Sequence, residues 1–134
     1  MIGVKQFNLL LRSCVVEGMN TINEDTLKDA VMKDKILGHD SFNWTSWNSF
    51  IYQDFFYSGD ESKSFHTERL LLVGVLLCSG NLYERAEVLC RIASKGDQNF
   101  VKNRDFWPIF VELVHICINL TVDQAKDIKR AEEI

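Results

Sequence analysis

The chain has 134 residues, of which 46% are hydrophobic and 25% are charged. This length and composition predict one compact domain, or two small halves that share a core, and exclude a disordered chain. The net charge of −4 offers no basic surface for nucleic acid or for an anionic membrane.

The first third of the chain predicts two helices. In residues 4–16, the apolar side chains of Phe7, Leu10, Leu11 and Cys14 recur at the spacing of one helical face. Residues 18–20 interrupt this pattern. Asn23 then provides a cap for a helix over residues 24–36, which has acidic side chains in its first turn.

The rest of the chain predicts further helices separated by polar segments. Residues 44–57 form an aromatic helix in this interpretation, and apolar runs predict helices over 67–78, 83–93 and 103–120. Pro108 falls near the first turn of the last of these, where proline is tolerated. Residues 121–134 are charged and predict a short terminal helix or a tail. We therefore expect an all-α fold with about six to seven helices.

Two of the polar connections have features of calcium-binding loops. Residues 58–69 and 94–105 match the 12-residue length of such a loop, and each lies between two predicted helices. Each has a single apolar residue at its eighth position, Phe65 and Val101. Their separation along the chain fits one loop, two helices of about 11 residues and a short linker. We expect the two loops to pair back to back through Phe65 and Val101.

The ligand positions of these loops are poorly filled. A calcium loop supplies oxygen ligands at positions 1, 3, 5, 7, 9 and 12, with glutamate at 12 and glycine at 6. In the first loop, Lys63 stands at the glycine position and Arg69 at position 12. In the second loop, Asp105 is the only acid at a ligand position. We therefore expect no cofactor, and no metal at the vestigial positions Ser58, Asp60, Ser62, Ser94 and Asp105.

With these features, residues 43–119 resemble a degenerate EF-hand pair of the type found in dystrophin and dystrobrevin. The stretches that carry the resemblance are residues 54–60, 70–78 and 83–94. In that family the helix–loop–helix pairs have largely lost calcium binding and support the binding of a partner protein. The resemblance therefore implies an EF-hand-like fold, no bound metal and a role in protein interaction.

The amino-terminal third contains a fainter third copy of the loop. Residues 15–26 place Ile22 at the eighth position and Asn20 at the turn position. A compressed fourth copy over residues 35–46, with Phe42 at the eighth position, starts too soon after the third for a standard pair. We divide the chain into an N-terminal helical hairpin (1–42), a degenerate EF-hand pair (43–120) and a charged C-terminal helix or tail (121–134). Whether the hairpin is an eroded EF-hand stays open.

Patterns of catalytic residues are weak. Glu112 and His115 have the spacing of half a carboxylate di-metal site, but the second motif and the two further glutamates are missing. His115 lies in an apolar run, and we interpret it as a core or groove residue. No Ser–His–Asp order, phosphate-binding glycine loop or nucleophile motif occurs, so we expect neither an enzyme nor a small-molecule substrate.

Aromatic side chains are the strongest candidates for a binding surface. Seven of them fall within residues 44–57, more than one buried face can hold. An EF-hand pair forms a groove that binds an amphipathic helix of a partner. The residues expected to line this groove are Trp44, Trp47, Phe50, Phe55, Phe106, Trp107, Phe110 and Val114.

The cysteines indicate a reducing compartment. Cys14, Cys78, Cys90 and Cys117 all lie in apolar helical stretches and form no CxxC pair, so we interpret them as free, buried side chains. We expect an intracellular protein, cytoplasmic or cytoskeletal, without a signal sequence. The longest apolar run, residues 70–78, is too short to span a bilayer as a helix.

Together these features favour a non-enzymatic adaptor or structural subunit that binds a helical or extended segment of a larger protein without calcium. Two alternatives stay open. The chain could be a calcium-responsive EF-hand sensor that depends on Asp105, or an unrelated helical subunit of a stable complex. Pairing of the loops through Phe65 and Val101 would distinguish the adaptor from the unrelated subunit.

Overall fold

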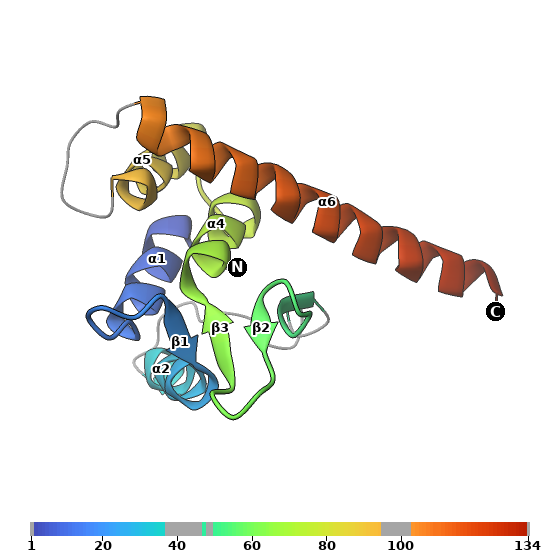
Figure 1. Cartoon of the computed structure of the whole chain (residues 1–134), viewed down its shortest axis with the longest axis horizontal. Helices are drawn as coiled ribbons and strands as arrows, with labels where there is room; N and C mark the ends of the chain where they lie inside the picture. Colours follow the sequence, from blue (N-terminus) through green and yellow to red (C-terminus); the bar gives the residue numbers. More distant parts are fainter. Residues whose placement is uncertain (1, 37–46, 48–49, 95–102, 134) are drawn as a thin grey trace.

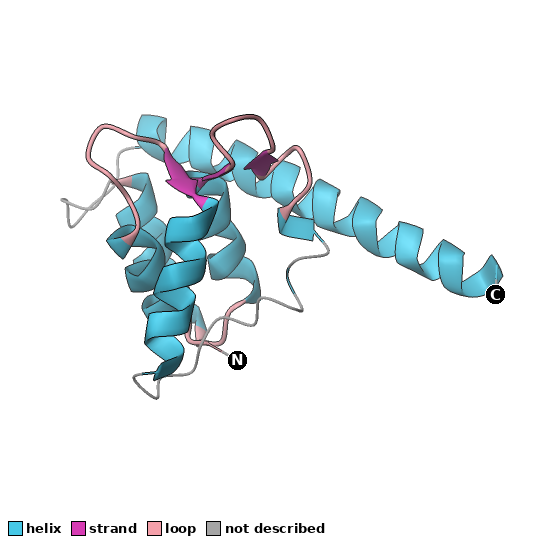
Figure 2. Cartoon of the chain, turned by 90° about the horizontal axis from the view of Figure 1, so that it is seen from below, coloured by secondary structure: helices cyan, strands magenta, loops and turns pink. Residues whose placement is uncertain are grey.

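The computed structural model describes residues 2–36, 47, 50–94 and 103–133, and this part of the chain is mostly helical (Figure 1). Its helices are α1 (Val4–Ser13), α2 (Glu24–Ile36), α4 (Thr67–Leu77), α5 (Leu82–Ala93) and α6 (Asn103–Glu133). Its strands are β1 (Thr21–Asn23), β2 (Tyr57–Ser58) and β3 (Ser64–His66). Figure 2 shows the strands at one side of the helices, joined to them by short loops.

Polar caps start two of the helices. The side-chain oxygen of Asn23 accepts hydrogen bonds from the backbone N–H of Asp25 (3.0 Å) and of Thr26 (3.3 Å), as the sequence predicts for the start of α2. At the start of α5, the side chain of Asn81 accepts from the N–H of Glu84, and Glu84 accepts in return from the N–H of Asn81. This reciprocal capping box satisfies two backbone donors that the helix leaves unpaired.

The three strands form a small antiparallel sheet in the order β1-β3-β2. Ile22 of β1 lies opposite Phe65 of β3, and both side chains are fully buried. Because β3 is the central strand, β1 and β2 occupy both of its edges. The expected pairing of Phe65 with Val101 is therefore replaced by pairing with Ile22 and Tyr57, while Val101 itself lies outside the described residues.

Helix α4 is the centre of the core. Every residue from Leu70 to Val75 is buried, because α1 and α5 pack on this helix and β3 leads into it. Gly74 allows the closest of these approaches, since a Cβ atom at this position would overlap the ring of Phe7 on α1. The apolar run at residues 70–78 is thus an interior helix whose neighbours cover almost its whole circumference.

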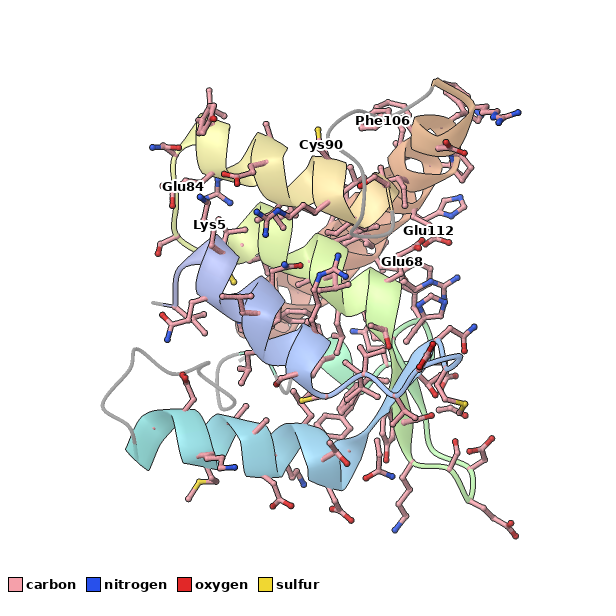
Figure 3. All side chains as sticks on the ribbon, turned by 90° about the vertical axis from the view of Figure 1, so that its left-hand side faces the viewer. Lys5, Glu68, Glu84, Cys90, Phe106 and Glu112 are labelled. Carbon is pink, nitrogen blue, oxygen red and sulfur yellow. The ribbon has the colours of Figure 1, made fainter. Side chains whose placement is uncertain are left out.

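The start of the chain is tied to the end of α4. The N–H of Val4 donates to the carbonyl of Ser79 (2.8 Å), and the N–H of Ser79 donates to the carbonyl of Ile2 (3.1 Å). Beside this junction, Lys5 of α1 forms an ion pair with Glu87 of α5 (2.8 Å). Figure 3 shows Lys5 next to Glu84, which also belongs to α5. These contacts hold α1, α4 and α5 together at one end.

Helix α6 continues much further than the sequence predicts. It runs without interruption from Asn103 to Glu133, about 46 Å at 1.5 Å per residue, and residues 121–133 extend it rather than forming a separate element. Pro108 lies within its first turns, as predicted. No glycine or proline follows Pro108, so nothing in the sequence ends the helix. Figure 1 shows its C-terminal half projecting beyond the other elements.

The expected fold class is correct only in its helical part. The described residues contain five helices rather than six or seven, and the three-stranded sheet means that the fold is not purely α. Among the described residues, the helix predicted over residues 44–57 is confirmed only up to Ile51. Trp47, Phe50 and Ile51 are helical, but two hydrogen bonds to the carbonyl of Gln53 close a turn that leads into β2.

The cysteines also divide differently from the prediction. All four thiols are free, but only Cys14 and Cys78 are buried, whereas Cys90 and Cys117 are exposed. Burial raises the pKa of the Cys78 thiol to about 12, so this side chain stays protonated and unreactive. Figure 3 shows Cys90 on the outer side of α5. Apolar sequence neighbours therefore did not predict which cysteines reach solvent.

Candidate functional site

The loop over residues 58–69 has the backbone shape of a calcium loop although its ligands differ. Lys63, at the sixth position, has a φ of 41°, the left-handed conformation that glycine normally provides there. The side chain of Asp60 accepts hydrogen bonds from both the N–H and the hydroxyl of Ser62. His66, at the ninth position, caps α4 by accepting from the N–H of Arg69 (3.4 Å).

The vestigial ligand positions in this loop bond to one another. Asp60 is held by Ser62, and the hydroxyls of Ser62 and Ser64 lie 3.1 Å apart. Hydrogen bonds from the side chain and backbone of Ser62 lower the pKa of the Asp60 carboxyl. Hydroxyl groups with a single carboxylate, Asp60, at the ligand positions are a weak ligand set for Ca²⁺, which prefers several carboxylates.

Arg69 occupies the position where a calcium loop has its bidentate glutamate, and it connects the loop to α6. Its guanidinium forms two bonds to the Glu112 carboxylate, from Nε (3.1 Å) and Nη2 (3.4 Å). Its Nη1 donates to the carbonyl of Phe55 (2.8 Å), and the group lies 4.0 Å from the centre of the Phe55 ring. Figure 3 shows Glu112 beside the first turn of α4, where Glu68 lies. A cationic side chain thus links three segments here.

The loop at residues 15–26 is described in full, whereas the loop at residues 94–105 is described only in part. In residues 15–26, Ile22 pairs with Phe65, but the left-handed residue is Gly18 (φ 82°) and not Asn20 as expected. In residues 94–105, Ser94 ends α5 and Asp105 lies exposed in the first turn of α6, whereas residues 95–102 lie outside the described chain. The compressed copy at 35–46 also falls largely outside it.

The expected binding groove is divided between the core and the surface. Trp47 and Phe50 are buried core residues with 4% and 8% exposure, so neither can line a groove. Phe55 is half-buried beneath the guanidinium of Arg69, and Phe106 is half-buried against the core. Trp44 lies outside the described residues. The structure does not bring the two expected walls together.

The remaining groove residues lie on an exposed apolar strip of α6. Trp107, Phe110 and Val114 are 65%, 45% and 41% exposed, and the strip continues through Ile118 and Val122 at the same three- and four-residue spacing. We define the outer face of α6 as Trp107, Phe110, Val114, Cys117, Ile118 and Val122. The sequence analysis did not include Cys117, Ile118 and Val122 among the groove residues. Their three- and four-residue spacing after Val114 would have predicted them.

The opposite side of α6 packs on the core. Ile109 and Ile116 are buried there, and Phe106, Leu113 and Leu120 are half-buried beside them. We define these five residues as the inner face of α6. From Phe110 to Val122 the outer side carries a shallow hollow that is almost wholly apolar, lined also by Leu113 and Thr121. A helix that is apolar on two sides, with one side covered, is typical of a binding surface.

Other candidate chemistry is not assembled in the described residues. Glu112 is engaged with Arg69, and His115 is exposed on α6 rather than in the core or a groove. Within the described part of the chain, no three His, Cys, Asp or Glu side chains gather as a metal site.

One stretch of α6 is long and apolar enough to cross a membrane, judged by length and composition alone. It runs from Arg104 to Val122 with a mean hydropathy of 1.4, and little of it is buried. Residues 70–78 remain the longest uninterrupted apolar run, because Glu112 and His115 interrupt the stretch in α6. The stretch in α6 meets the criterion through its average hydropathy, which the search for uninterrupted runs did not consider. The same stretch contains the outer face.

Comparison with known proteins identifies no relative: no protein-family model matches the chain, and no curated protein or solved structure matches it either.

Proposed function

We propose that this chain is a non-enzymatic adaptor or structural subunit that binds a helical segment of a partner protein along the outer face of α6, without calcium. The observation that carries the proposal is the exposed apolar strip from Trp107 to Val122 on a helix whose inner face is already packed. Contiguous apolar surface of this kind on a helix is a common recognition site for another helix.

Two features support a calcium-independent role. Arg69 stands at the position where the carboxylate of a working loop would bind the ion, and its charge is directed to Glu112. The side chains of Asp60 and Ser62, at two ligand positions of loop 58–69, bond to each other. The resemblance to the dystrophin-type EF-hand region adds no support, because Phe65 pairs with Ile22 and Tyr57 instead of Val101. The four free cysteines favour an intracellular location.

The buried side of α6 favours a protein partner over a lipid bilayer. Glu112 lies in the middle of the apolar stretch and bonds to Arg69, and Ile116 is fully buried against the core. A spanning helix would have to leave these contacts and place a carboxylate near the bilayer centre, which costs several kcal/mol. The outer face has no lysine or arginine to attract anionic lipid headgroups.

The test compares two tagged variants in affinity isolations run with calcium and with chelator. Ile118→Asp places a charge in the outer face, and Leu82→Asp places one at an even more exposed apolar residue of α5. We expect the same partner in both ionic conditions from the unmodified chain and from Leu82→Asp, and none from Ile118→Asp. A partner retained by Ile118→Asp would contradict the proposed surface. Capture that requires calcium would favour the calcium sensor instead.

A further inference from the structure

We infer that the segment covering the outer face of α6 is α6 of a second copy of this chain, packed antiparallel. This inference rests on the proposed function, because it names the partner of the same surface. The six outer-face side chains carry no charge, so the complement they require is a neutral apolar helix face. The same face of another copy meets this requirement.

The order of side chains along the outer face fits antiparallel self-pairing. Its N-terminal end is aromatic, with Trp107 and Phe110, and its C-terminal end is β-branched, with Ile118 and Val122. A twofold axis near Val114 would place Trp107 opposite Val122 and Phe110 opposite Ile118 of the second copy. Each layer then combines a large side chain with a smaller one, which is the arrangement that fills helix–helix contacts.

A parallel arrangement fits less well. It would place Trp107 against Trp107 of the second copy, and Val122 against Val122. The aromatic layers would then hold the helices apart at one end of the contact. The β-branched layers at the other end are smaller and need the helices close together.

The size of the surface is sufficient for a specific contact. The strip from Trp107 to Val122 covers about 22 Å of helix. Burying five large apolar side chains from each copy removes on the order of 1,000 Å² from water, which is near the minimum for a biological interface and typical of transient ones. We therefore expect a reversible dimer whose formation depends on concentration.

The first test measures the molar mass of the purified chain by sedimentation over a wide concentration range. We expect dimers that dissociate on dilution, with Ile118→Asp raising the dissociation constant about 30-fold or more, as for a central interface residue. Leu82→Asp is the matched control, because Leu82 is exposed on α5, and it should dimerise like the unmodified chain. Circular dichroism of both variants checks that they fold.

The second test uses the unmodified chain and its own cysteines. Cys117 belongs to the outer face, whereas Cys90 is exposed on α5, and Cys14 and Cys78 are buried. We expect a maleimide reagent to modify Cys117 several-fold more slowly at dimer concentrations than on dilution, while the modification rate of Cys90 stays constant. No substitution is needed, so this measurement does not depend on the folding of a variant.

The outcomes separate the inference from the proposed function. A chain that stays monomeric at all concentrations, with a modification rate of Cys117 that does not change on dilution, would overturn the inference. The same result with partner capture still lost in Ile118→Asp would leave the proposed function in place. A dimer insensitive to Ile118→Asp would overturn the inference by locating the contact elsewhere. Co-sedimentation with phosphatidylcholine–phosphatidylserine vesicles that depends on Ile118 would overturn both, because the face would bind lipid.

Discussion

Helices α4 and α6 are both rich in apolar side chains, yet their surroundings differ. In α4, all residues from Leu70 to Val75 are buried, because α1, α5 and α6 pack on this helix. In α6, Ile109 and Ile116 are buried while Trp107 and Ile118 are exposed. Apolar side chains along a helix indicate surface that is more stable when it is buried. How much of that surface is buried within one chain depends on which other elements pack against the helix.

The largest expected effect separates the two faces of α6. Ile116→Ala removes a fully buried side chain from the inner face and should lower the free energy of unfolding by about 2–5 kcal/mol. Ile118→Ala removes an exposed one and should change it by less than about 0.5 kcal/mol in the monomer. Urea unfolding at low protein concentration measures both. Equal losses would mean that the outer face is packed after all.

A somewhat smaller effect tests the tight packing of α4. Gly74→Ala would place a methyl group in the ring of Phe7, so α1 and α4 must separate slightly, at a cost of about 1–3 kcal/mol. Gly59→Ala is the matched control, because its added methyl would meet only Tyr57 at 3.6 Å, an ordinary contact. Thermal unfolding of both variants gives the comparison. A Gly74→Ala protein as stable as the control would show that α4 is loosely covered.

The link between α4 and α6 should contribute an intermediate amount. The ion pair of Arg69 and Glu112 is three-quarters buried, so losing it should cost about 1–2 kcal/mol, between exposed and interior pairs. Arg69→Gln should cost more than Glu112→Gln, because Arg69 also donates to the Phe55 carbonyl. A double-mutant cycle isolates the pair. A coupling energy near zero would mean that α6 is held by its inner face alone.

Replacing Lys63 tests the strained turn that precedes α4. Lys63→Gly relieves a left-handed backbone but makes the unfolded chain more flexible, so we expect a net stabilisation of about 0.5–1 kcal/mol. Gly18→Ala reverses the change at a position with a φ of 82° and open space around the Cβ, and it should destabilise by about 1 kcal/mol. Denaturant midpoints measure both. Destabilisation by Lys63→Gly would imply that the lysine side chain itself is required.

The smallest effect concerns pH at the start of α4. Burial, and then the neighbouring charge of Arg69, lower the pKa of His66, whose Nδ1 accepts from the N–H of Arg69. His66 therefore binds a proton more readily in the unfolded chain than in the folded one. The free energy of unfolding should be at its full value above about pH 6.5 and should decrease as the pH falls toward the lower pKa of the folded state. His66→Asn keeps a capping acceptor and should reduce the slope of melting temperature against pH. His115→Asn, at an exposed position, is the control.

The sequence predicted the local elements better than their associations. Asn23 marks the start of α2, and the apolar runs mark α4 and α5 to within a residue, because capping and periodicity depend on neighbours along the chain. The pairing of Ile22 with Phe65 was not predicted, since the choice between two apolar loop residues depends on how distant helices pack. For the same reason the sequence did not separate Trp47 in the core from Trp107 on the surface.

By itself, the sequence determined that this chain is mainly helical, that its loop 58–69 lacks the carboxylates of a calcium site, and that its aromatic side chains exceed one buried face. The tertiary structure decided that β1 joins β3, that Arg69 connects to Glu112, and that α6 keeps an uncovered face from Trp107 to Val122. The reason is physical. Helix capping and periodicity depend on residues that are close along the chain. The burial of an apolar surface depends on segments that are far apart along the chain.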